Sequence, residues 1–138
     1  MKNERGSALI ITLMLLLILT AVGLYAINTA TTEIDVTLQS KVGTVTLNAA
    51  EAGTYVGIDR IPLELTGAGV TATLSNNASY TVTSLFTGEL SIVPGYGVNY
   101  RFANFRMNST GNAPPPFVAQ RTIVAVANFG PVPIGTMY

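Results

Sequence analysis

The chain has 138 residues, a length that fits one domain with an appended element. It carries seven Lys and Arg against seven Asp and Glu, so no net charge draws it to nucleic acid or acidic lipid. It contains no Cys and no His, which excludes disulfides, thiolate sites and imidazole chemistry. Only 10% of the residues are charged and 49% are apolar, and the first 32 residues account for much of this imbalance.

A long uncharged segment near the N-terminus predicts a membrane-spanning helix. Between Arg5 and Glu33 there are 27 consecutive uncharged residues, and 21 of them form the apolar segment Ser7–Ile27. Roughly 20 apolar residues in a helix cross the hydrocarbon core of a bilayer. The segment is longer than the roughly 7–15 apolar residues of a signal peptide, and no convincing A-x-A cleavage signal follows it. We therefore favour a retained anchor over a discarded signal peptide.

The charges before this segment predict its orientation. Lys2, Arg5 and the amino terminus outweigh the single acid Glu4. The positive-inside rule keeps such a head in the cytoplasm and places the residues after Ile27 outside. The simplest interpretation is a single-pass membrane protein with an external domain.

The next segment has the periodicity of an amphipathic helix. Its apolar residues recur at steps of three and four, and no Pro occurs before Pro62. We therefore expect one continuous helix over residues 7–61, apolar in its first half and amphipathic in its second. The residues expected to pack on the rest of the chain are Ile34, Leu38, Val42, Val45, Ala49, Ala52 and Val56.

Residues 62–138 predict a small antiparallel sheet. Alternating or β-prone segments occur at 68–74, 79–86, 97–107 and 117–128, with turn-forming stretches between them. The last nine residues, 130–138, hold two Pro and two Gly and cannot form a central strand, which leaves a flap over the sheet or a loose tail. A sheet unit of 77 residues buries little core alone, so we expect an α+β fold with the amphipathic helix docked on one sheet face.

The N-terminal sequence resembles the type IV pilin family. The resemblance rests on "ERG" followed by "SALIITLMLLLILTAVGLYAI", and on "NAAEAG" at 48–53, which is similar to minor pilins of the PilX type. It covers about the first 55 residues. It implies that a prepilin peptidase removes the leader, residues 1–6, after Gly6, and that Ser7 becomes the methylated first residue.

The resemblance also implies where the protein acts. The helix would hold the chain in the bacterial inner membrane, with the C-terminal domain outside the cytoplasm, and would later pack inside a pilus. The residues implied in membrane retention and filament packing are Leu9, Ile10, Ile11, Leu13, Leu16, Leu19 and Val22. The implied partners are the major pilin and other minor pilins.

One position departs from the family pattern. Most pilins carry Glu at the fifth mature position, where this chain has Ile11, and no acid follows until Glu33. In the family that carboxylate is thought to pair with the amino terminus of a neighbouring subunit. Its absence points to an initiating or accessory position in the filament.

Candidate sites for enzyme chemistry are weak. Glu33 and Asp35 are two residues apart and point in different directions on a helix, while Asp59 and Glu64 are too few to hold a hard cation. We interpret all four as solvated charges. The Gly-Tyr-Gly of 95–97 precedes a strand, so we interpret it as a turn and not as a phosphate loop.

Two other patterns have ordinary interpretations. Arginines among aromatic residues can bind single-stranded nucleic acid, but three arginines are sparse and aromatic residues in strands are usually core. The residues concerned are Arg101, Arg106 and Arg121, with Tyr100, Phe102 and Phe105. The sequons that begin at Asn77 and Asn108 fall in predicted loops.

The sequence therefore predicts a structural protein with no catalytic residues, cofactor or metal. The leading hypothesis is a minor type IV pilin that primes or caps a filament. The alternative is a single-pass anchored protein whose outer domain binds a surface or ligand. The pattern leaves open whether the system serves adhesion, motility, secretion or DNA uptake.

Overall fold

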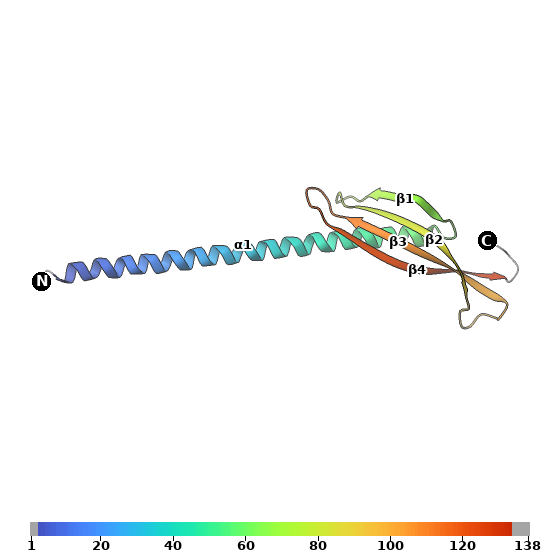
Figure 1. Ribbon diagram of the computed structural model, residues 1–138, viewed down its shortest axis with the longest axis horizontal. Helices are drawn as coiled ribbons and strands as arrows, with labels where there is room; N and C mark the ends of the chain where they lie inside the picture. Colours follow the sequence, from blue (N-terminus) through green and yellow to red (C-terminus); the bar gives the residue numbers. More distant parts are fainter. Residues whose placement is uncertain (1–2, 134–138) are drawn as a thin grey trace. The chain divides into compact units, whose positions relative to one another are not determined.

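The computed structural model describes residues 3–133 and has one long helix followed by four strands (Figure 1). The helix α1 spans Asn3–Asp59. The strands are β1 (Leu65–Thr73), β2 (Ser79–Ser91), β3 (Tyr100–Asn112) and β4 (Gln120–Pro133). The expected α+β class, with one continuous helix and a four-stranded antiparallel sheet, is confirmed.

Local sequence explains both the length and the end of α1. No Pro interrupts it, and its threonines bond their hydroxyls to the carbonyl four residues earlier; Thr20 donates to Leu16 at 2.7 Å and Thr37 to Glu33 at 2.8 Å. This arrangement hides the polar group from an apolar environment. The helix ends at Asp59, just before Ile61 and Pro62, where the proline disfavours a helical predecessor.

The chain divides into two compact units within the helix. The boundary falls between Ser40 and Lys41, so the last part of α1 belongs to the same unit as the sheet. The boundary predicted from the sequence, after residue 61, separates the helix from the strands and so follows secondary structure instead of compactness.

The sheet is a simple meander with order β1-β2-β3-β4, and every neighbouring pair is antiparallel. β3 and β4 pair without interruption from Ala103–Phe129 to Asn112–Gln120. β1 is less regular, because its register shifts between Leu65 and Val70. Gly67 and Gly69 have φ of 71° and 67° in this interval, a conformation that glycine adopts easily.

Two loop predictions require correction. β3 continues through Asn108–Thr110, so this sequon lies in a strand, whereas Asn77 does lie in the turn before β2. β4 continues through Gly130–Pro133, which were expected in a flap or tail. β4 is an edge strand, and an edge position tolerates proline because one side of the strand needs no ladder hydrogen bond. Residues 134–138 lie outside the described residues.

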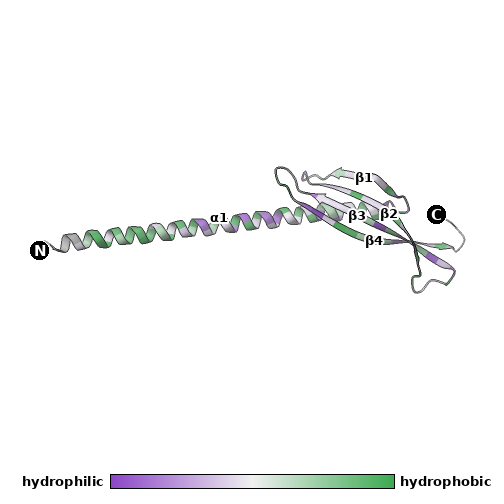
Figure 2. Cartoon of the chain, in the orientation of Figure 1, coloured by the Kyte–Doolittle hydropathy of each residue, from purple (hydrophilic) through white to green (hydrophobic). Residues whose placement is uncertain are grey.

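The core lies between the second half of α1 and the inner face of the sheet. Leu65, Tyr80 and Val82 form a buried cluster, and Ala52 and Val56 of the helix pack against it. Phe105 and Met107 of β3 are also buried. Figure 2 shows apolar residues on both the helix and the strands of this unit.

Small residues bring the helix close to the sheet. Ala49 and Ala50 are fully buried, and the Ser109 hydroxyl donates a 2.6 Å hydrogen bond to the Ala50 carbonyl. Gly53 faces Ser109 and Tyr80, so a side chain at this position would overlap both residues. Across the interface, a methyl group on Gly111 would meet the backbone of Thr46 and Ala50. Glycine on both surfaces thus sets the distance between helix and sheet.

These contacts also fix the direction of the helix within the unit. Gly111 lies against 46–50, Ser109 against Ala50 and Gly53, and Met107 against Gly57. Along this series of contacts the residue numbers of the helix rise as the residue numbers of β3 fall. Residues 46–57 of α1 therefore run antiparallel to β3 and parallel to β4.

Substituting Gly111 with Ala should destabilise the sheet unit. The added methyl would press on helix backbone, which cannot move aside as a flexible side chain can, and overpacking of this kind costs about 1–3 kcal/mol. The matched control is Gly43→Ala, because a methyl there meets no atom within 4 Å and alanine raises helix propensity. Chemical denaturation of the two variants checks this; equal stability of Gly111→Ala and the parent chain would contradict the proposed close approach.

Truncation should show which part of the helix the sheet requires. Removing residues 1–40 leaves the compact sheet unit intact, so we expect a monodisperse product with a cooperative thermal transition. Removing residues 1–61 uncovers the inner face of the sheet and should give aggregate. Size-exclusion chromatography and thermal melting measure both outcomes. A monodisperse, cooperatively melting 62–138 fragment would show that the helix is not part of the core.

Candidate functional site

The first half of α1 is an exposed apolar surface. Every residue from Ser7 to Lys41 is exposed, including the large hydrophobic side chains. The seven residues expected in membrane and filament packing expose between 56% (Ile11) and 70% (Leu9) of their surface; they are Leu9, Ile10, Ile11, Leu13, Leu16, Leu19 and Val22. A continuous apolar surface of this kind marks a membrane or protein contact.

The same segment meets the requirements for crossing a bilayer. Among the described residues, one helix is long and apolar enough, with a mean hydropathy of 2.6 over its best 18-residue window. None of this 18-residue window is buried against the rest of the described chain, unlike the core helix of a soluble domain. The apolar half of α1 is thus compatible with membrane anchoring.

Burial of the amphipathic half begins later than the periodicity indicated. Ala49 is buried, Val42 and Val45 are half-buried, and Ala52 and Val56 pack on the core cluster. Ile34 and Leu38 are 65% and 41% exposed. The helical period continues smoothly from one segment into the next, so periodicity alone could not locate the point at which the sheet begins to cover the helix.

Two glycines that set the helix–sheet distance, Gly53 and Gly57, were not among the residues expected at this contact. They follow the expected Ala49 at intervals of four residues, which places all three on one face of the helix. This spacing was the available signal. Its partners on the sheet, Ser109 and Gly111, carry no comparable pattern because they are defined only by pairing register.

The acidic residues form no cluster. Glu33, Asp35 and Asp59 are exposed, as expected for solvated charges. Glu64 is exposed too, but its carboxylate accepts a 2.9 Å hydrogen bond from the Phe86 amide and so ties the start of β1 to β2. Within residues 3–133, no group of three or more Asp and Glu side chains could hold a metal ion.

Of the aromatic residues near the arginines, Tyr100 is 42% exposed and two phenylalanines are buried. Phe102 and Phe105 are 7% and 2% exposed, so their rings are core and unavailable to a base. Arg101 donates to the Val98 carbonyl at 2.7 Å, near the turn that contains Gly95 and Gly97. Only Arg106 and Arg121 remain as exposed basic residues on the strands. Their register partners, Val126 and Gly111, place them on opposite faces of the sheet.

The outer face of the sheet, opposite the helix, is polar at one end and mixes apolar and polar side chains further along. A row of four threonines crosses all strands at Thr71, Thr81, Thr110 and Thr122. Hydroxyl pairs link Thr71 to Thr81 at 3.0 Å and Thr110 to Thr122 at 3.1 Å. Two rows further along, Arg106 lies between Leu85 of β2 and Val126 of β4.

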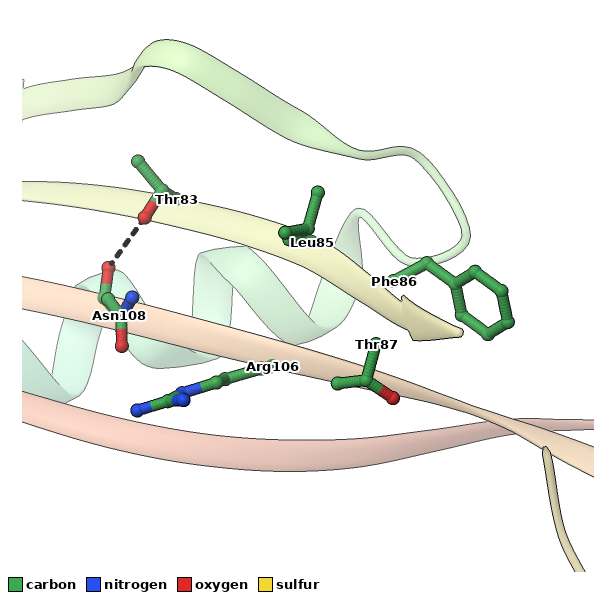
Figure 3. A pocket seen from close by; sticks show the side chains of 6 residues that line it. All are labelled: Thr83, Leu85, Phe86, Thr87, Arg106 and Asn108. Carbon is green, nitrogen blue, oxygen red and sulfur yellow. Dashed lines mark hydrogen bonds between the residues drawn. The ribbon is translucent and has the colours of Figure 1, made fainter. Parts of the chain in front are cut away.

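A shallow hollow opens on this face beside Arg106 (Figure 3). It is lined by Thr83, Leu85, Phe86, Thr87, Arg106 and Asn108. The two threonine hydroxyls donate to strand carbonyls, Thr83 to Asn108 at 3.5 Å and Thr87 to Asn104 at 3.0 Å. The Arg106 guanidinium is therefore the charged donor that this hollow offers to another molecule.

Comparison with known proteins identifies the helix. The family model described as PilX N-terminal matches residues 5–54, which include the whole apolar segment and the first contacts with the sheet. No curated protein and no solved structure matches the chain. The resemblance to PilX-type pilins is confirmed over the matched region, and residues 5–54 carry the N-terminal region of the PilX-type type IV pilin family.

Proposed function

We propose that this protein is a minor type IV pilin that helps to start or cap a pilus. The observation that carries the proposal is that the PilX N-terminal match at 5–54 includes the exposed apolar segment Ser7–Ile27 of α1. An apolar segment that no other described residue covers needs an external apolar environment. The bilayer supplies it before assembly, and the helices of neighbouring pilins supply it afterwards.

In this proposal residues 1–6 are a leader that a prepilin peptidase removes. Ser7 becomes the mature N-terminus and is methylated. Before its removal, the cationic leader stays in the cytoplasm, which places the C-terminal domain outside it. The segment from Leu9 to Val22 then holds the chain in the membrane until it enters the filament. The sheet unit from Lys41 onward is the part that other subunits or surfaces contact.

The side chain at the fifth mature position supports an accessory role. In a repeating shaft each subunit makes the same head-to-tail contact, so an Ile11 subunit would leave one amino-terminal charge unpaired at every step. An unpaired buried charge costs about 3–5 kcal/mol. One such defect at an end is tolerable, whereas a shaft built of them is not.

A single-pass anchored protein with a binding domain is the second candidate. The hollow beside Arg106 would serve as its binding surface. The two functions differ in processing, because an anchored protein keeps Met1 and a pilin begins at Ser7.

Gly6→Val should block maturation in cells that assemble pili. The peptidase must bring its catalytic groups close to the backbone at this bond, and glycine leaves that approach open. Immunoblotting should show the full-length form in the membrane fraction and none in sheared pili. The control is Gly23→Ala, whose added methyl meets no atom within 4 Å. Normal maturation of Gly6→Val would show that residues 1–6 are not a pilin leader.

The proposed accessory role predicts a low copy number. Quantitative mass spectrometry of sheared pili should find this chain at a small fraction of the major pilin, and cells that produce it alone should assemble no filament. Ile11→Glu should raise its share, because the restored carboxylate can pair with a neighbouring amino terminus. A ratio near one to one for the parent chain, or filaments of this chain alone, would contradict the role given to Ile11.

A further inference from the structure

The two edges of the sheet differ in their ability to accept another strand. β1 pairs regularly with β2 only over Val70–Thr73, and its bulge carries Gly67 and Gly69 in left-handed conformation. Short, bulged edges are a common protection against pairing with other chains. β4 has 14 residues and a constant register over Gln120–Phe129.

The central part of the β4 edge, Thr122–Gly130, lacks the residues that usually block strand addition, which occur only at its two ends as Arg121, Pro131 and Pro133. From Thr122 to Gly130 there is no charged residue and no proline. Charged side chains and prolines are the ordinary protection of a long edge strand. On the outer face beside this edge, Val124 and Val126 are 54% and 64% exposed. Among residues 3–133 no strand pairs with the outer side of β4, so the edge combines unpaired ladder positions with apolar side chains.

A second copy of this chain does not fit the β4 edge. Residues 46–57 of α1 run parallel to β4, so a two-fold axis that pairs two β4 strands antiparallel also reverses the helix. Two chains inserted in one membrane, or packed in one pilus, have helices that run in the same direction. Continuation of the sheet without reversal would place β4 against β1 of the next copy, which offers the bulged edge. Both of these arrangements disfavour a second copy, so we take the occupant to be a different chain with the same membrane orientation.

The positive charge of Arg106 favours a negatively charged side chain on the strand that docks at this edge. Arg106 makes no hydrogen bond or ion pair among the described residues, and its cross-strand neighbour toward the edge is Val126. In the four rows from Gln120 to Val126 it is the only charged side chain on the outer face. A strand added to β4 lies about 4.8 Å from β4 and so two strand spacings from β3; the long side chains of Arg106 and of a carboxylate residue can span this separation across Val126.

We propose that the β4 edge docks one edge strand from the head of a different pilin, with a carboxylate of that strand reaching Arg106. This inference rests on the proposed function, since it takes the partner from the same pilus. It gives an accessory pilin a directional contact. The open edge recruits one neighbour, and the bulged β1 edge stops further growth of the sheet.

Site-directed cross-linking of the full chain tests the proposal in cells that assemble pili. The chain contains no cysteine, so Val124→Cys and Val126→Cys can each be labelled with a thiol-reactive benzophenone at one site. Thr73→Cys is the matched control, an exposed position on the same sheet face at the opposite edge. After irradiation, mass spectrometry should find both β4 variants joined to an extended segment of another pilin, with at least a fivefold lower yield from Thr73→Cys.

A second set of variants tests the charge. Arg106→Glu in the Val124→Cys background should lower the yield at least threefold, whereas Arg121→Glu, on the other face of the sheet, should leave it within twofold. Equal yields from the two edges, adducts only with a second copy or with non-pilin proteins, or no adduct would overturn the proposal. The sheared pili of the same cells separate the two claims: absence of this chain from them refutes the proposed function, and presence without a β4 adduct refutes this inference alone.

Discussion

The close contact between the second half of α1 and the inner face of the sheet is the constraint on which the rest of the structure depends. Gly53 and Gly57 on the helix lie directly against side chains of the sheet, and Gly111 on β3 lies against the helix backbone, so none of the three has room for a side chain. The buried Ser109 hydroxyl then reaches the Ala50 carbonyl at 2.6 Å. This contact covers one face of the sheet and one face of the helix from Val42 onward, and it leaves the segment before Lys41 without any cover.

That division explains how one helix can have two environments. In the segment that contacts the sheet, the sheet covers the apolar side chains. The apolar side chains of Ser7–Ile27 need a bilayer or other helices to cover them. Its threonines satisfy their hydroxyls on the helix backbone, as in Thr29, which donates to Tyr25 at 3.0 Å. The segment therefore presents an apolar surface all round and suits lipid and packed helices equally.

Much of this arrangement could be predicted from the sequence, because it depends on local patterns. The uncharged run after Arg5, the three-and-four spacing after Glu33 and the alternation in the last 77 residues indicated the helix and the sheet. The limits of burial could not be predicted, since Ile34 and Leu38 share the period of Val42 but lie where no strand covers them. Gly130–Pro133 joined β4 because the strand is at an edge, and strand order is a property of the whole sheet. The cross-strand neighbours on the outer face, such as Arg106 and Val126, depend on strand register and could not be predicted from local patterns either.

The central claim is that the exposed helix belongs first to a membrane and then to a pilus. Its most direct test is the mass of the chain recovered from each place, measured on intact protein from membranes and from sheared pili of the same cells. The account predicts that the protein in pili begins at Ser7 with a methylated amino group, and that longer chains beginning at Met1 occur only in the membrane. Recovery of the chain from membranes alone, and only in a form that begins at Met1, would contradict this prediction and leave a simple membrane anchor.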